Sequence, residues 1–332
     1  MSEQLADRIL VLAEQQPSRF QISEIASSGL GRTLQFDAYR PWAFEVGPQY
    51  AVVGYYQGQV PMVSVIDHIS MGECKSVPLE KVVNHKQASR FVMRAIQGEL
   101  AMLRRLDGEH LNVSVFSLPD LKECRTSEVS VKRIVSASGS KIYCQLVPYK
   151  DLWSNPFCIM NYPELTVLGS ASGFLLPEPI YGYSTPKLCA RAWENVGTGN
   201  VLEPGTGILV DLETRTSGKT AISKVEGFIP TGVSELPVVA YGDQAYILLH
   251  RVLDPNKHSL DLMVVQPGQI AVHCKSLYSN SPMPVKYDLL DASAHTLLTR
   301  RLEVIHILST DDFTDLLEPI PGTYAKIVPS LA

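Results

Sequence analysis

Short runs of β-branched and aromatic residues, separated by turn residues, recur along the whole chain. Tyr50 to Tyr56 and Val60 to Ile66 are two such runs, and Gln57-Gly58-Gln59 stands between them. β-branched and aromatic side chains favour strands, and a short link that contains glycine is typical of a β-hairpin. The 22 glycines and 22 prolines supply frequent turns. The sequence therefore predicts a mainly β fold.

The second half of the chain carries the densest series of these runs. Turn residues separate several of them, as at Gly242-Asp243, Asp254-Pro255-Asn256 and Pro267-Gly268. Closely spaced strands with such turns are typical of sandwiches and barrels. We predict strands over residues 207–212, 221–228, 238–241, 245–252, 260–265 and 269–277. The expected architecture is one or two sandwich or barrel-like units, with an α+β fold as the alternative.

Two other segments show helical spacing of apolar residues. Residues 3–16 have this spacing, and Pro17 ends the pattern. Residues 85–106 carry an apolar stripe and are followed by Asp107-Gly108, a typical end of a helix. The stripe comprises Phe91, Val92, Ala95, Ile96, Leu100 and Leu103. We therefore predict an N-terminal helix and one long central helix.

A change of composition between residues 148 and 186 divides the chain. This stretch contains six prolines, with Trp153, Tyr162, Tyr181 and Tyr183 between them. It predicts an α+β domain over residues 1–150, including the helix 85–106, and a β-rich domain over residues 151–332. The same stretch is also consistent with a long ordered excursion over the surface of one domain, because its aromatic residues argue against a flexible linker.

Composition narrows the class of protein. Of the 332 residues, 45% are hydrophobic and 19% are charged, which favours a sizeable core over disorder. The net charge of −5, without a basic tail, argues against general attraction to nucleic acid or to an anionic membrane. No apolar run reaches the roughly 18 residues of a membrane span. Six widely spaced cysteines and an acidic N-terminus without an export signal predict reduced thiols and a cytoplasmic location.

Motifs for known chemistry fail at their defining positions. Gly169 to Gly173 has Ala171 where a serine nucleophile would stand, and no phosphate-binding loop with the G-x-x-x-x-G-K-[ST] pattern occurs. The glycine-rich stretch from Gly197 to Gly207 leads into a predicted strand, where a dinucleotide site requires a helix. Histidines and carboxylates form only isolated pairs, and no H-E-x-x-H motif or cysteine cluster occurs. We predict neither a cofactor nor a metal.

Basic residues follow one face of the predicted central helix. Lys86, Arg90 and Arg94 recur every four residues, and no acidic residue stands four positions from them. Lys81 and the pair Arg104-Arg105 would extend this face. Such a stripe predicts binding to an anionic partner or RNA. The alternative is a solvent-exposed helix face that binds nothing.

Two functional hypotheses follow. Many short strands without an active-site motif suggest a self-associating structural protein, such as a viral or phage shell or coat subunit, which would be part of a virus particle. The alternative is an enzyme, a hydrolase or transferase, whose site is carried on loops. Its candidate residues are Asp67, His68 and the pair Asp291 and His295.

Overall fold

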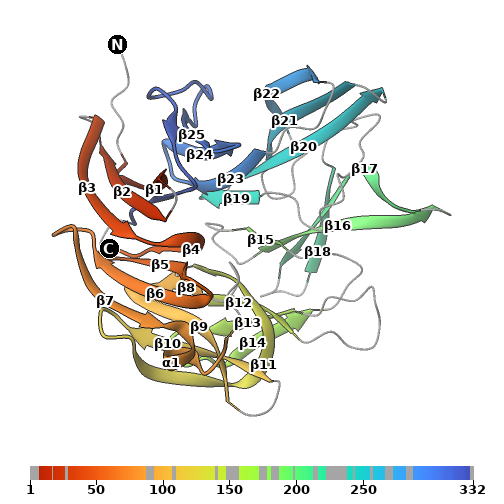
Figure 1. Ribbon diagram of the computed structural model, residues 1–332. Coiled ribbons are helices and arrows are strands. Elements are labelled where there is room, and N and C mark those ends of the chain that lie inside the picture. The colour runs from red at the N-terminus through yellow and green to blue at the C-terminus, as the bar shows by residue number, and fades with distance from the viewer. Residues whose placement is uncertain are drawn as a thin grey trace. The chain divides into compact units, whose positions relative to one another are not determined.

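The computed structural model shows a chain built almost entirely of strands (Figure 1). Among the described residues, α1 (Leu79–Val83) is the one helix. The structure describes residues 7–16, 18–26, 29–86, 93–106, 110–138, 141–146, 157–171, 178–180, 187–196, 199–211, 216–221, 238–241, 244–254, 257–265, 272–281 and 287–329. The predicted β-rich character of the chain is confirmed.

Contacts within the chain define two compact units. Unit 1 comprises residues 1–148, 156–170 and 321–332, and unit 2 comprises residues 149–155 and 171–320. The C-terminal residues therefore return to unit 1, which the predicted division at residue 150 does not include. The two predicted domains stay a prediction.

Unit 1 consists of antiparallel meanders, in which each strand pairs with the next along the chain. Two of its sheets have four strands, in the orders β27-β1-β2-β3 and β4-β5-β6-β7, and the third has seven, in the order β14-β13-β12-β11-β10-β9-β8. The strands are β1 (Ile9–Gln16), β2 (Arg19–Ala26), β3 (Gly29–Asp37), β4 (Tyr39–Val46), β5 (Tyr50–Gln57), β6 (Val60–Asp67), β7 (Gly72–Pro78), β8 (Met93–Ile96), β9 (Glu99–Arg105), β10 (Leu111–Ser117), β11 (Lys122–Ser138), β12 (Lys141–Leu146), β13 (Phe157–Asn161), β14 (Val167–Ala171) and β27 (Tyr324–Ile327).

The long strand β11 joins two four-stranded meanders. Its first part pairs with β10, from Lys122 to Ser130, and its second part pairs with β12, from Val131 to Ser138. Register shifts interrupt both pairings. The seven-stranded sheet is therefore two successive meanders that share one bulged strand.

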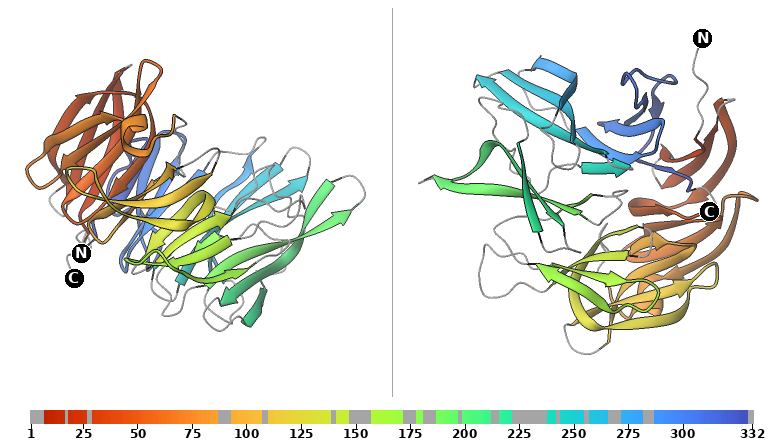
Figure 2. Two further views of the ribbon diagram at one scale, coloured as in Figure 1. Left: turned by 90° about the horizontal axis from the view of Figure 1, so that it is seen from below. Right: turned by 180° about the vertical axis from the view of Figure 1, so that it is seen from behind.

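The first sheet brings the two ends of the chain together. β27, near the C-terminus, pairs with β1, so that Ile9 lies opposite Ile327 and Leu12 lies opposite Tyr324. Figure 2 shows the blue C-terminal strand beside the red N-terminal strands. This sheet becomes four-stranded only when both ends of the chain contribute.

The central strands β5 and β6 of the sheet β4–β7 are buried on both faces. Successive side chains of a strand point to opposite faces, and those of β5 divide accordingly between two cores. Ala51, Val53 and Tyr55 belong to a core shared with β1 and β2, whereas Val52 belongs to a core shared with β8–β13. These two strands therefore read as nearly continuous apolar runs instead of a strict alternation.

Unit 2 repeats the same arrangement in three four-stranded meanders. Two of them share a core, in which Tyr246 and Leu262 of one sheet pack with Leu297 and Leu308 of the next. The strands are β15 (Glu178–Ile180), β16 (Lys187–Val196), β17 (Gly199–Asp211), β18 (Thr216–Ala221), β19 (Val238–Tyr241), β20 (Gln244–Asp254), β21 (Lys257–Val265), β22 (Val272–Ser281), β23 (Tyr287–Ala292), β24 (Thr296–Arg301), β25 (Val304–Ser309) and β26 (Ile320–Pro321).

Both predicted helices are wrong, and with them the α+β description of residues 1–150. The segment 3–16 contains strand β1, and the segment 85–106 contains the hairpin of β8 and β9. Gln97 and Gly98 form its turn with φ of 45° and 81°, the left-handed values of a tight hairpin turn. Strands buried on two faces place apolar residues at nearly every position, and this pattern matches helical spacing by coincidence. Residues 1–6 and 87–92 lie outside the described residues.

Candidate functional site

The three basic residues singled out from the sequence do not share a helix face, because no helix forms there. Lys86 is exposed and lies 3.4 Å from Glu80 in an ion pair. Arg94 lies on β8, where it pairs with Glu45 of β4 at 3.3 Å, and both side chains are largely buried. Arg90 lies outside the described residues. Binding of an anionic partner or RNA by these residues stays a prediction. The shared helix face on which that prediction depends does not exist.

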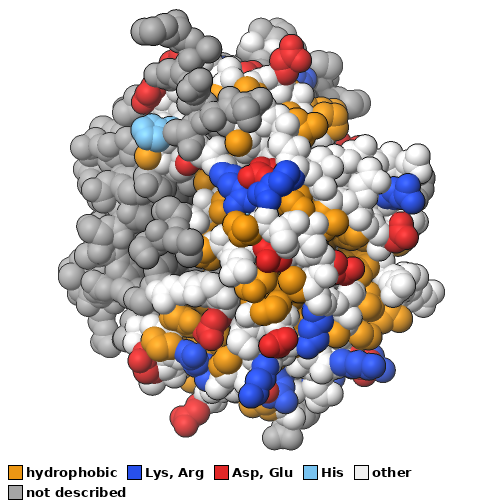
Figure 3. Space-filling view, turned by 90° about the vertical axis from the view of Figure 1, so that its left-hand side faces the viewer, with side chains coloured by type: hydrophobic (Ala, Val, Ile, Leu, Met, Phe, Trp, Pro, Cys, Tyr) orange, Lys and Arg blue, Asp and Glu red, His pale blue; other side chains and the backbone are white. Residues whose placement is uncertain are grey.

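Charges on the surface are mixed. On the face drawn in Figure 3, Lys and Arg side chains lie beside Asp and Glu side chains in several separate groups. A broad field of one sign does not cover this face. An anion-binding site on this face would therefore be local, where cations outnumber the carboxylates next to them.

A groove in unit 1 has this property. It has a volume of about 290 Å³ and lies where β7 and α1 meet β9, β10 and the start of β11. Its lining combines four apolar residues, three cations and one carboxylate, which leaves two positive charges in excess. The lining residues are Lys75, Val77, Lys81, Val82, Arg104, Phe116, Leu121 and Glu123.

The short helix α1 positions one side of the groove. Leu79 and Val83 anchor it in the core with 0% and 1% of their surface exposed. Asn84 then ends the helix in the left-handed conformation, with φ of 51°. Because Leu79 and Val83 face the core, Lys81 and Val82 are left at the groove.

Two of the three cations have partners in the groove wall. Arg104 on β9 forms an ion pair with Glu123 on β11, and the Lys75 ammonium donates to the Asp120 carbonyl oxygen. The Arg104 Nε atom is enclosed and has no hydrogen-bond acceptor among the described residues. Lys81 is exposed, and no described residue forms an ion pair with it. Lys81 thus retains donors that a ligand can use.

Asp67 and His68, the first candidates for a loop-borne active site, have structural partners instead. The Asp67 carboxylate accepts hydrogen bonds from the Ile69 and Ser70 amides at 2.8 and 3.1 Å. Burial raises the pKa of Asp67, but these amide hydrogen bonds bring it below its usual value. His68 is fully buried, and its Nε2 donates to the Gly47 carbonyl oxygen at 2.9 Å. Burial is the main cause that lowers the pKa of His68.

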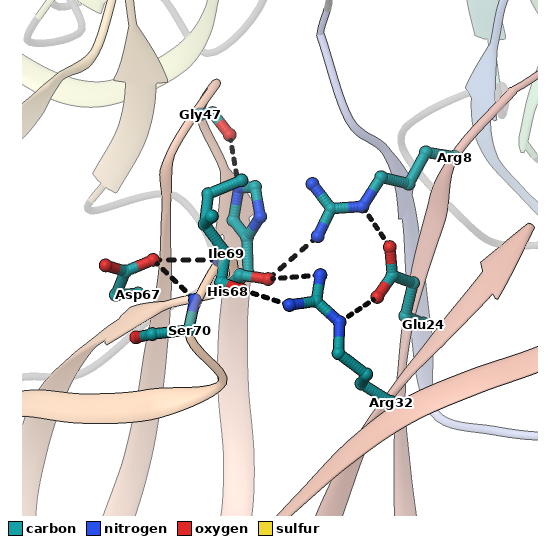
Figure 4. Close-up of polar contacts among 8 residues, drawn as sticks. All are labelled: Arg8, Glu24, Arg32, Gly47, Asp67, His68, Ile69 and Ser70. Carbon is teal, nitrogen blue, oxygen red and sulfur yellow. Dashed lines mark hydrogen bonds and ion pairs between the residues drawn. The ribbon is translucent and has the colours of Figure 1, made fainter.

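The His68 carbonyl oxygen is part of a polar cluster that joins two sheets (Figure 4). It accepts a hydrogen bond from Arg8 at 2.7 Å and a longer one from Arg32 at 3.4 Å. Both guanidinium groups also bind the Glu24 carboxylate, and Arg32 donates to the Ile69 carbonyl oxygen. Burial raises the pKa of Glu24, but the adjacent Arg32 and Arg8 hold it below its usual value. The cluster fixes the turn after β6 against β1–β3.

Asp291 and His295 do not form the helical pair that a metal site would require. Asp291 lies on β23, and His295 is exposed in the turn before β24, where its amide donates to the Ser293 hydroxyl at 3.1 Å. In the described part of the chain, no three histidine, cysteine or acidic residues gather as metal ligands. The two pairs proposed from the sequence therefore do not show the converging set of groups that catalysis requires.

The sequence pointed to part of the groove for a different reason. The sequence predicts that Lys81 and Arg104 extend a basic stripe on a helix. In the structure, Lys81 lies on α1 and Arg104 on β9, and both line the groove. Lys75 and Glu123 carried no signal, because each is one charged residue in a strand. Only the packing of two separate sheets brings them together.

Comparisons with known proteins identify the fold. No family model matches the chain, and no curated protein matches its sequence. A hypothetical selenium-binding protein from Sulfolobus tokodaii has a similar structure, with a TM-score of 0.57 at 8% identity over 97% of this chain and 92% of that one. The WD40 domain of Toxoplasma gondii coronin gives 0.52 at 8% identity, over 97% and 78%. The β-propeller domain of Myceliophteria thermophila Cps50 gives 0.51 at 10% identity, over 87% and 88%.

These similarities show a propeller-like fold and correct two predictions. WD40 domains and other β-propellers are built from successive four-stranded antiparallel sheets, as this chain is. The predicted sandwich or barrel with long helices is therefore wrong, and so is the viral or phage shell or coat subunit. Self-association stays a prediction. Within the described residues, the structure contains no helix with the length and hydropathy of a membrane span.

Proposed function

We propose that this chain is a propeller-type binding or scaffold protein that holds a partner protein at the groove between β7–α1 and β9–β10. The observation that carries the proposal is the combination of an apolar floor and unneutralised cations in one groove. Partner proteins are bound by apolar anchors surrounded by polar groups, and this groove offers both. The propeller-like fold supports the proposal, because rigid sheets hold the groove in one shape.

The positions of the residues proposed for a loop-borne active site favour a binding function over a catalytic one. His68 is buried, Asp67 caps a turn and His295 is exposed apart from any described acid–base partner. The groove itself contains Glu123 and Arg104 in a mutual ion pair. The one carboxylate of the groove lining is therefore already bound by a lining arginine.

Affinity purification with a charge-reversal pair tests the proposal. Lys81→Glu changes an exposed groove residue without an ion-pair partner among the described residues, whereas Lys132→Glu changes an exposed residue of β11 outside the groove lining. We expect a partner, identified by mass spectrometry and retested as a purified pair, to be lost with Lys81→Glu and retained with Lys132→Glu. Equal recovery with the two variants would contradict the proposal.

A further inference from the structure

The apolar floor of the groove indicates what part of a partner it takes. Phe116 and Leu121 are 2% and 8% exposed, and the half-buried Val77 and Val82 continue the apolar surface toward the rim. A volume of about 290 Å³ lies just below the range for ligand pockets, which is roughly 300–1,000 Å³. The groove is therefore the right size for one or two apolar side chains of a peptide.

The charges at the rim specify the flanking chemistry. Lys81 and Lys75 carry positive charges that no lining carboxylate neutralises, because the one lining carboxylate, Glu123, is paired with Arg104. A bound segment with carboxylates beside its apolar anchor would complement both lysines.

Nucleic acid fits the groove less well than a peptide does. Sites for single-stranded RNA stack bases on accessible aromatic rings. Phe116 is the one aromatic side chain among the described lining residues, and it is almost fully buried. The floor of the groove consequently offers no ring face for a base.

From these observations we propose that the groove binds an acidic peptide segment of a partner protein, with one or two apolar side chains packed against Val77 and Val82 above the buried Phe116 and Leu121. This inference rests on the proposed function and names the chemistry of the partner. Because the attraction at the rim is electrostatic, affinity falls as salt concentration rises.

Selection from a random peptide library on the full-length protein tests the inference. We expect the selected peptides to combine glutamate or aspartate with an apolar residue. Lys81→Glu should weaken their binding at least tenfold, measured by calorimetry, and Lys132→Glu should change it less than twofold. Both variants should unfold at the same midpoint temperature as the unchanged protein, which would show that they are folded.

The other outcomes separate the two proposals. Peptides that need Lys81 but carry no acidic residues would overturn the acidic segment and leave the binding function in place. A single-stranded RNA probe that binds more tightly than any peptide, and is lost with Lys81→Glu, would also overturn the acidic segment. Two results would overturn both proposals. One is that the selected peptides bind equally to the Lys81→Glu and Lys132→Glu variants, and the other is that the selection yields no peptide that depends on the groove.

Discussion

The indole ring of Trp42 lies directly against Gly54, on the strand next to its own. A Cβ atom added to Gly54 would stand 2.6 Å from three atoms of the indole ring. The Trp42 Nε1 donates to the carbonyl oxygen of Tyr55 at 3.1 Å, so the ring cannot move without breaking this bond. Glycine at this position is thus required by the packing of β4 on β5.

We expect Gly54→Ala to lower the free energy of unfolding by about 1–3 kcal/mol, because overpacking forces a rigid ring and its strand to shift. Urea unfolding measures the change. The matched control is Gly72→Ala, whose added Cβ would meet only the Ser70 Oγ at an ordinary 3.5 Å. That control should stay within roughly 0.5 kcal/mol of the unchanged protein. Equal stability of the two variants would contradict the described packing.

Glu24→Gln should destabilise the protein by about 1–3 kcal/mol, because it removes the charge that the guanidinium groups of Arg8 and Arg32 share in a partly buried site. The matched control is Asp37→Asn, which removes an ion pair with Arg19 whose two side chains are 51% and 88% exposed. Exposed pairs contribute little, so this control should change stability by less than roughly 1 kcal/mol. A larger effect of Asp37→Asn than of Glu24→Gln, by urea unfolding, would refute this role for the cluster.

Stability should fall as pH drops below about 6.5, the ordinary pKa of histidine. Burial lowers the pKa of His68 and of His85, and the charge of Arg105 lowers the pKa of His85 further. The unfolded chain therefore binds more protons than the folded chain below that pH, and protonation favours unfolding. In His68, the Nδ1 atom that would take the proton is buried with no partner among the described residues.

Urea midpoints measured between pH 8 and pH 5 check this prediction. The midpoint should be flat above pH 7 and decline below about 6.5, and His68→Gln should reduce the decline. His110→Gln, at an exposed position, serves as the control and should leave the decline as it is. A midpoint that does not change between pH 7.5 and pH 5.5 would show that these histidines titrate alike in the folded and unfolded chains.

The sequence was sufficient to predict strands wherever a clear turn separates two β-branched runs. The hairpin predicted from Tyr50 to Ile66 is confirmed as β5 and β6, with Gly58 at φ of 63° in its turn. It was insufficient for β8 and β9, because Met93, Ile96 and Leu100 are all buried between sheets and leave no alternating polar face. The turn at Gln97-Gly98 was the local signal that contradicted a helix.

The groove is formed by contacts between separate elements, and local sequence patterns do not predict such contacts. Lys75 on β7 and Arg104 on β9 are separated in the chain by the short helix α1 and the strand β8, and they meet only because β7 and β9 belong to neighbouring meanders. Spacing along the chain predicts which residues share a face of one element, but not which elements pack together. The sequence thus predicts the basic character of this region but not its geometry.

Photo-crosslinking from inside the groove tests the binding function most directly. A diazirine amino acid placed at Val82, in the groove lining, is compared with one at Val60, which is 48% exposed at the start of β6. We predict one adduct of defined mass from position 82, with a partner protein, that is absent from position 60 and disappears when Lys81→Glu is added. The same adducts from both positions, or an adduct at position 82 that survives Lys81→Glu, would contradict it.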